Sequence, residues 1–289
     1  MAFLGKVRFD RATTRGIGSL FVALTMACGG PPPVSREPVV VVSVLPQAWL
    51  VERLAGDRVE IVVMIPPGAS PATFEPELDQ LRALAEASLY VKVGHPHFPF
   101  EAAWLDRLLA DQPELPVVDL AGGRSSVAQD PHVWLSPRRV DVMIDPLAEA
   151  LARVVPEEHD AILERAAALH AEVATIDARL GRILAPARGR SFLTVHAAWG
   201  YLAEDYQLVQ LAIEHENKEP DPHRVAALIE QARALGIDVV FAQPQFDPRS
   251  ALLLAEAIGG RVEWIDPLAR DWPVNLVRVA ELLAQAARG

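Results

Sequence analysis

The sequence predicts an α/β protein with two parallel-sheet α/β lobes joined by a long rigid helix. Short β-branched runs alternate with helical stretches in the first half of the chain and again in the second, which is typical of successive βαβ units. Between the halves, residues 138–184 show no strand pattern and are rich in alanine, leucine, glutamate and arginine, which favour helices. At 289 residues the chain also exceeds what one core usually organises.

The first lobe begins with residues 39–44, a continuous apolar run that predicts a strand buried on both faces. Gly56 is expected to end the helix that follows this strand. Further strands are expected at residues 59–64, 89–93 and 117–120, and helices at 45–55, 77–87 and 101–110.

The second lobe repeats this plan, and a helical spacer separates it from the first. Its strands are expected at residues 192–195, 208–213, 239–242 and 262–265. Pro146 and Pro156 are expected to break the spacer, and the part after Pro156 to form one long helix. Such a spacer leaves a cleft between the lobes. Ligands of parallel sheets bind beyond the carboxyl ends of the strands, so the residues directly after each strand matter most.

The composition argues against a nucleic-acid partner and against a metal site built from cysteine. A formal net charge of −11 argues against a nucleic-acid partner, which requires a basic surface. The chain has a single cysteine, so the protein forms no internal disulfide and no thiolate zinc site. Any metal must therefore be bound by nitrogen and oxygen.

The N-terminus indicates export. Basic residues precede an apolar run at residues 17–26, which is shorter than the ~20 residues of a membrane-spanning helix. Cys28 lies at the expected cleavage point and looks like a lipobox cysteine, although Thr25 stands where leucine is usual. The alternative is a plain cleaved signal with an incidental cysteine. The predicted segments are a signal peptide at 1–27, a tether at 28–38, the first lobe at 39–137, linking helices at 138–187 and the second lobe at 188–289.

Histidines gather at the predicted strand exits. His95 and His97 follow the third strand, His132 the fourth and His196 the fifth, while Asp266 follows the last. Convergent imidazoles and a carboxylate suit a borderline cation such as zinc. Each histidine alone is more simply a strand cap or a core residue, but their common placement favours a metal site in the interlobe cleft.

Four segments carry a resemblance to a known family. They are Pro-Gly-Ala-Ser-Pro-Ala-Thr-Phe-Glu-Pro at 67–76, Asp-Pro-His-Val-Trp-Leu-Ser-Pro at 130–137, Thr-Val-His-Ala-Ala-Trp-Gly-Tyr at 194–201 and Ile-Asp-Pro-Leu at 265–268. They resemble the zinc/manganese solute-binding proteins of ABC importers. The resemblance implies a four-ligand metal site in the cleft, with His132, His196 and Asp266 matching the second, third and fourth ligands. In having a histidine as the third ligand, the sequence resembles the zinc-type members of the family.

The first ligand departs from the family pattern, because Ala72 stands where the family normally carries histidine. Three explanations remain open: a water molecule, Glu75, or a nearby histidine takes that position. Adjacent parallel strands lie about 4.8 Å apart, so a residue at a neighbouring strand exit would reach a similar point. We favour substitution by His95, or otherwise His97, over the alternative that both are ordinary loop residues.

The resemblance implies an extracytoplasmic protein that captures a divalent transition metal and delivers it to the permease of an ABC importer. Zinc is the expected metal, with Mn²⁺ or Fe²⁺ as others, and no catalytic residues are expected. The protein would be a monomer in the periplasm or on the outer face of the cytoplasmic membrane, anchored by lipid at Cys28. The alternatives are a zinc-dependent hydrolase with Glu75 as general base, and a metal-binding adhesin or storage lipoprotein.

Overall fold

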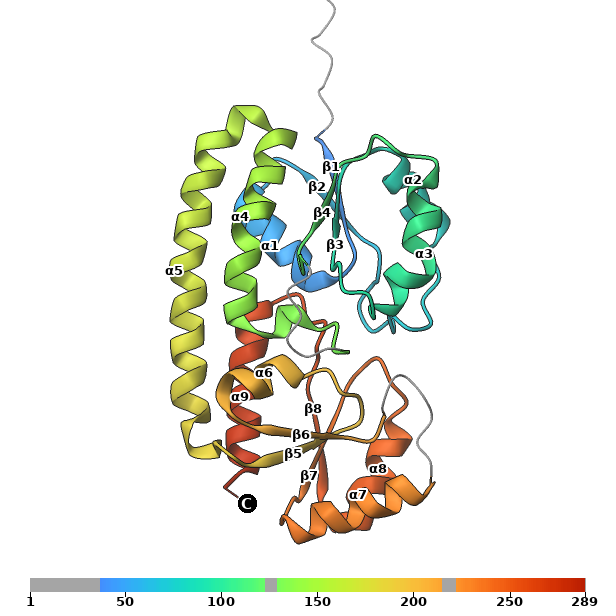
Figure 1. Ribbon diagram of the computed structural model, residues 1–289, viewed down its shortest axis with the longest axis vertical. Helices are drawn as coiled ribbons and strands as arrows, with labels where there is room; N and C mark the ends of the chain where they lie inside the picture. The colour runs from blue at the N-terminus through green and yellow to red at the C-terminus, as the bar shows by residue number, and fades with distance from the viewer. Residues whose placement is uncertain (1–36, 123–128, 215–221, 289) are drawn as a thin grey trace, which may run out of the picture. The chain divides into compact units, whose positions relative to one another are not determined.

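The computed structural model describes residues 37–122, 129–214 and 222–288 (Figure 1). The predicted signal peptide, Cys28 and most of the predicted tether lie outside these ranges. The described residues form two four-stranded sheets in which every paired strand is parallel. The predicted α/β class is therefore confirmed.

The first sheet has the strand order β2-β1-β3-β4. Its strands are β1 (Val39–Val42), β2 (Glu60–Val63), β3 (Ala87–Lys92) and β4 (Val117–Asp119). The helices after them are α1 (Leu45–Ala55), α2 (Leu78–Ala85) and α3 (Pro99–Ala110). The central strand β1 is fully buried, with Val41 in register with Val62 on one side and Tyr90 on the other. Helices cover both faces of the sheet (Figure 1), which explains the continuous apolar run at residues 39–44.

The second sheet repeats this order as β6-β5-β7-β8. Its strands are β5 (Ser191–Thr194), β6 (Val209–Ala212), β7 (Val239–Ala242) and β8 (Arg261–Trp264). Its helices are α6 (Gly200–Tyr206), α7 (Pro222–Ala234), α8 (Pro248–Ile258) and α9 (Trp272–Ala286). Val239 and Phe241 pack into the main core, whereas Val240 and Ala242 belong to a second apolar cluster beside α8. This sheet is also buried on both faces.

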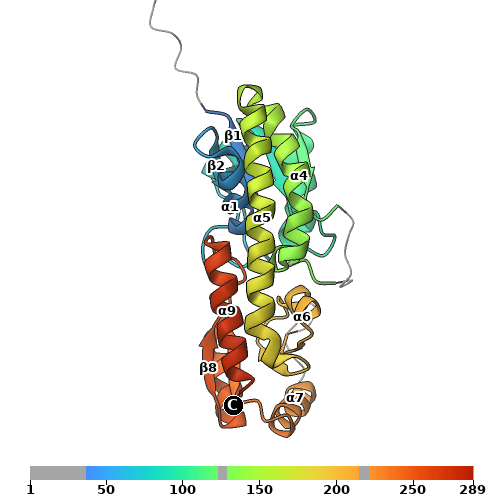
Figure 2. The same cartoon turned by 90° about the vertical axis from the view of Figure 1, so that its left-hand side faces the viewer.

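Two long helices connect the lobes. They are α4 (Pro137–Val154) and α5 (His159–Leu184), accompanied by the short 3₁₀ helices η1 (Val133–Leu135), η2 (Pro156–Glu158) and η3 (Ala185–Ala187). With 26 residues, α5 is about 39 Å long. It packs against α1 and α4 beside the first sheet and against α9 beside the second (Figures 1 and 2). The predicted long connecting helix is confirmed.

Pro146 does not break the spacer, so that prediction is wrong. It lies inside α4, which continues to Val154. Pro146 and Val142 both lie on the exposed face of the helix, so the Val142 carbonyl, which loses its N–H partner to the proline, can be hydrated. The buried face of α4 holds the helix together through Met143, Ile144 and Leu147.

The strand order separates two loops that were expected to leave neighbouring strands. The loop that carries Ala72 follows β2 and the loop that carries His95 and His97 follows β3, but β1 lies between these two strands. Their exits are therefore two strand spacings apart, about 10 Å.

The predicted lobe boundaries stay a prediction. Within the described residues, no helix is both long and apolar enough to cross a membrane.

A doubly paired histidine links α5 to α4. The Nδ1 atom of His170 lies 2.7 Å from Asp141 Oδ1, and its Nε2 atom lies 3.0 Å from Asp145 Oδ1. Burial opposes the charge on His170, but hydrogen bonds and attraction from the two carboxylates outweigh it, so the pKa of His170 is raised above its usual value. The charged imidazole thus stabilises the contact between the two helices.

Replacing His170 with alanine is expected to lower the free energy of unfolding, and more at about pH 6 than at about pH 9. The contribution is fully present below the unfolded pKa of about 6.5 and is lost as pH rises through the raised folded pKa. Because Asp141 is about half exposed and Asp145 is largely exposed, the loss at pH 6 should be only about 0.5–1 kcal/mol. Urea denaturation of the His170→Ala variant at both pH values measures it. His159→Ala, at an exposed site on the same helix, is the control, and an equal loss at both pH values would contradict the assignment.

Candidate metal centre

A cavity of about 560 Å³ lies at the carboxyl ends of both sheets. Its walls come from loops that follow strands of both lobes, as expected for parallel sheets. The lining residues are Ser70, Pro71, Ala72, His97, Phe98, Pro99, Gln129, Asp130, Pro131, His132, His196, Ala197, Gly200, Gln210, Glu214, Gln245, Phe246, Pro267 and Leu268. Three of the four predicted strand-exit histidines are among them.

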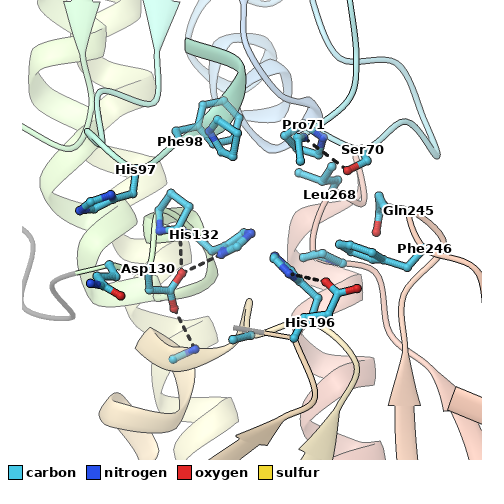
Figure 3. Close-up of a pocket in the computed structure, with 18 of the residues that line it drawn as sticks. Ser70, Pro71, His97, Phe98, Asp130, His132, His196, Gln245, Phe246 and Leu268 are labelled. Atoms are coloured by element: carbon cyan, nitrogen blue, oxygen red, sulfur yellow. Dashed lines mark hydrogen bonds and ion pairs between the residues drawn. The ribbon is translucent and has the colours of Figure 1, made fainter. Parts of the chain in front are cut away.

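Asp130 fixes the ring of His132. Its Oδ1 atom lies 2.7 Å from His132 Nδ1 and accepts the backbone N–H of His132 at 2.9 Å. Its Oδ2 atom accepts the backbone N–H of Gly200, from the second lobe, at 3.1 Å (Figure 3). A carboxylate on Nδ1 favours the tautomer with its proton there, which leaves the lone pair of His132 on Nε2, where it is available to a metal ion.

Gln243 holds the backbone of His196 from the neighbouring strand. Its Oε1 atom accepts the His196 N–H at 3.0 Å, and its Nε2 atom donates to the His196 carbonyl at 2.9 Å. Gln243 is 1% exposed, so this clamp is shielded from water. The His196 ring stacks on Phe246 with centroids 4.7 Å apart.

The surroundings of His196 favour its neutral form. Burial lowers the pKa of His196 and outweighs the opposing effect of Glu214, while the nearby His132 lowers it further. A neutral imidazole is the form that binds metal.

The rings of His132 and His196 come from different lobes and meet in the cavity. Their centroids are 5.2 Å apart and their planes are nearly perpendicular, at 79°. With metal–nitrogen bonds of about 2.0–2.1 Å and tetrahedral angles, the centroids of two imidazoles on one zinc ion lie about 5 Å apart. The spacing of this pair therefore fits a shared tetrahedral cation.

The loop with His95 and His97 is fixed at its start. Gly94 has φ +78°, which L side chains rarely adopt, and a Cβ atom there would lie 1.8 Å from Asp119 Oδ1, so another residue would be strained and would displace the Asp119 side chain. The buried Glu101 carboxylate accepts the N–H groups of Val93 and Gly94 at 2.6 and 2.8 Å. These contacts set the path of the chain as it leaves β3.

The two histidines of this loop differ in their placement. His97 lines the cavity, but its ring points away from His132 and His196 in Figure 3. His95 is 3% exposed, is not among the lining residues, and its Nδ1 atom accepts the backbone N–H of His97 at 3.2 Å. Burial lowers the pKa of His95. Of the two, His97 is the one the structure places at the cavity.

The carboxylates predicted as ligands lie at the margin. Asp266 precedes the lining residues Pro267 and Leu268, and its Oδ1 atom accepts N–H groups from Gln245 at 2.8 Å and Leu268 at 2.9 Å. Glu75 is exposed and does not line the cavity, although Ala72 does. Across residues 37–122, 129–214 and 222–288, no three His, Cys, Asp or Glu side chains are already gathered closely enough to hold a metal ion.

Sequence reasoning assigned no role to several residues that build the cavity. Asp130, Glu214, Gln243, Gln245 and Phe246 all contact a predicted ligand. The acidic residue two positions before His132 was visible in the sequence. The partners of His196 depend on the order of the strands in the sheet, which cannot be deduced from the sequence.

A two-lobed α/β fold with an imidazole pair in the cleft defines a solute-binding protein for a transition-metal ion. Residues 40–285 match the model of the family described as "ZnuA: Zinc-uptake complex component A periplasmic". The chain belongs to this family, in agreement with the resemblance seen in the sequence.

Individual relatives agree with this assignment. A crystal structure of ZnuA is 37% identical, with a TM-score of 0.82, and covers 87% of this chain and 100% of that one. A putative metal-binding protein of Chlamydia muridarum is 25% identical over 256 residues, covering 85% of this chain and 90% of that one. The zinc-binding lipoprotein AdcA of Streptococcus pneumoniae is 24% identical over 273 residues, covering 87% of this chain and 54% of AdcA. The chain thus spans about half the length of AdcA.

Replacing Gln243 with leucine is expected to lower the free energy of unfolding by about 2–4 kcal/mol, because it leaves the His196 N–H and carbonyl groups without their partners. Urea denaturation of the metal-free protein measures this loss. Gln285→Leu, an exposed change on α9, is the matched control. If the two variants lost the same small amount, the clamp would be of no energetic importance.

Proposed function

We propose that this protein captures Zn²⁺ outside the cytoplasm and delivers it to the permease of an ABC importer. The observation that carries the proposal is the approach of His132 and His196, from opposite lobes, to a ring separation of 5.2 Å within one cavity. Membership of a periplasmic zinc-uptake family supports it. Nitrogen ligands from imidazole suit zinc, with Mn²⁺ or Fe²⁺ as weaker candidates.

In this proposal His132 binds the ion through Nε2, since Nδ1 faces Asp130. His196 binds it from the second lobe, and the remaining oxygen of Asp266 turns toward it from the loop after β8. Metal binding requires neutral imidazoles, so affinity should fall as the pH drops below about 6.5. Burial of His196 favours its neutral form.

Metal capture requires the ligand side chains to move together around the ion, because the cavity is much larger than one ion. A cavity of about 560 Å³ has room for many water molecules, each of which takes about 30 Å³. Because His132 and His196 belong to different lobes, one ion bound to both links the lobes across the cleft. The permease would then distinguish the metal-bound form from the metal-free form.

For the position of Ala72, the candidates from the sequence are His97, His95 and Glu75. His97 is the best placed of these because it lines the cavity. Its ring would have to turn toward His132 and His196 to bind the same ion (Figure 3).

The same proposal includes attachment and assembly. We propose a monomer anchored by lipid at Cys28, a role supported by the name of the lipoprotein AdcA. We also propose that the protein is not an enzyme. The hydrolase alternative assigned the general base to Glu75, but that side chain is exposed and lies outside the cavity wall, which argues against that assignment.

Replacing either His132 or His196 with alanine is expected to weaken Zn²⁺ binding by about 100-fold or more. Even the mutation of a residue that only hydrogen-bonds to a metal ligand typically lowers metal affinity by about 10–100-fold. Competition with a chromophoric chelator at fixed pH measures the affinity. His159→Ala, an exposed histidine on α5, should bind zinc like the unmodified protein. Unchanged affinity in both ligand variants would defeat the assignment.

Delivery is tested separately by uptake. A strain that lacks this protein should accumulate zinc poorly from a zinc-limited medium, and the unmodified chain should restore uptake. His132→Ala and His196→Ala should not restore it. Full restoration by both variants would show that import does not pass through this cavity.

A further inference from the structure

The carboxylate of Glu214 lies beside His196 because the strands that precede these two residues are paired in the sheet. Thr194 of β5 is in register with Ala212 of β6. The pairing continues past both strands, because the backbone N–H of Glu214 donates to the Val195 carbonyl at 2.9 Å. His196 and Glu214 therefore stand at equivalent positions on adjacent parallel chains, where backbones are about 4.8 Å apart.

The distance between the two side chains fits two ligands of one ion. Glu214 Oε2 lies 3.4 Å from His196 Nδ1, which is beyond the usual 2.7–3.2 Å of an N–H···O hydrogen bond. Two donor atoms that each lie about 2.0–2.1 Å from a tetrahedral zinc ion are separated by roughly 3.4 Å. Glu214 and His196 both line the cavity, and the His196 ring stacks on Phe246.

The other carboxylates near the cavity are already engaged. Asp130 accepts N–H groups through both oxygens, from His132 and from Gly200. Asp266 accepts two N–H groups through Oδ1, from Gln245 and Leu268. Asp130 and Glu214 each face a proposed ligand, but Asp130 accepts backbone N–H groups through both oxygens, whereas Glu214 lies against the His196 ring.

We propose that Glu214 binds the metal directly together with His132 and His196 and, in place of His97, supplies the donor that Ala72 cannot. This inference rests on the proposed function. Glu214 comes from the second lobe, whereas the family's first ligand would come from the first lobe. The coordination sphere of this chain is thus displaced toward the second lobe, and one imidazole is exchanged for a carboxylate, a harder ligand.

The test is Zn²⁺ affinity of the full chain carrying Glu214→Gln, a change that keeps the side-chain size and removes the charged donor. We expect affinity to fall about 100-fold or more. Glu230→Gln, an exposed carboxylate on α7 of the same lobe, is the matched control and should bind normally. Normal zinc binding by Glu214→Gln would overturn the inference while leaving the proposed function intact. Failure of the unmodified chain to bind zinc would instead remove the proposed function.

Cobalt separates a ligand from a positioning residue. Co²⁺ bound in place of zinc has visible absorption bands that report the atoms around it. Exchanging Glu214 for histidine replaces an oxygen donor with nitrogen, so these bands should shift if residue 214 binds the ion. Identical spectra of Co²⁺-loaded Glu214→His and unmodified protein would overturn the inference. This second variant also decides the matter if Glu214→Gln fails to fold.

Discussion

The spacing of His132 and His196 depends on how firmly the two lobes are held in place. Neither lobe carries both rings, so their 5.2 Å separation is set by the contacts that hold the two lobes together. Helix α5 packs along both lobes, and the loops around the cavity are joined directly. Trp134 donates from its indole to the Pro267 carbonyl at 2.7 Å, and Asp130 accepts the Gly200 N–H at 3.1 Å. A continuous helix bends little, so the approach of the rings is built into the fold.

The same register that makes the second sheet also furnishes His196 with its surroundings. β5 lies between β6 and β7, so the residue after β5 has a neighbour on each side. On one side Gln243 fixes the backbone, and on the other Glu214 faces the ring. Two polar side chains with different tasks thus reach one histidine because parallel strands end at the same edge.

The sequence predicted the fold well because its signals were local. Buried parallel strands appear as β-branched runs, and each of the eight expected strands overlaps an observed one. The site was harder to predict, because strand order is not local. The argument that brought His95 near Ala72 assumed neighbouring strands, but β1 lies between them. The same argument holds for His196 and Glu214, whose strands do pair. Pro146 misled for a related reason, since its tolerance depends on which face of α4 is exposed.

Charge balance explains why carboxylates accompany both rings. A divalent cation that leaves water for a partly enclosed cavity loses hydration that must be replaced by opposite charge or strong dipoles. Asp130 behind His132 and Glu214 beside His196 supply two negative charges, which match the charge of one Zn²⁺. Asp266 adds a third, and N–H groups that donate to Asp130 and to Asp266 offset part of the charge of both carboxylates. A monovalent cation would leave the cavity with excess negative charge, so this arrangement favours a doubly charged ion over the more abundant Na⁺ and K⁺.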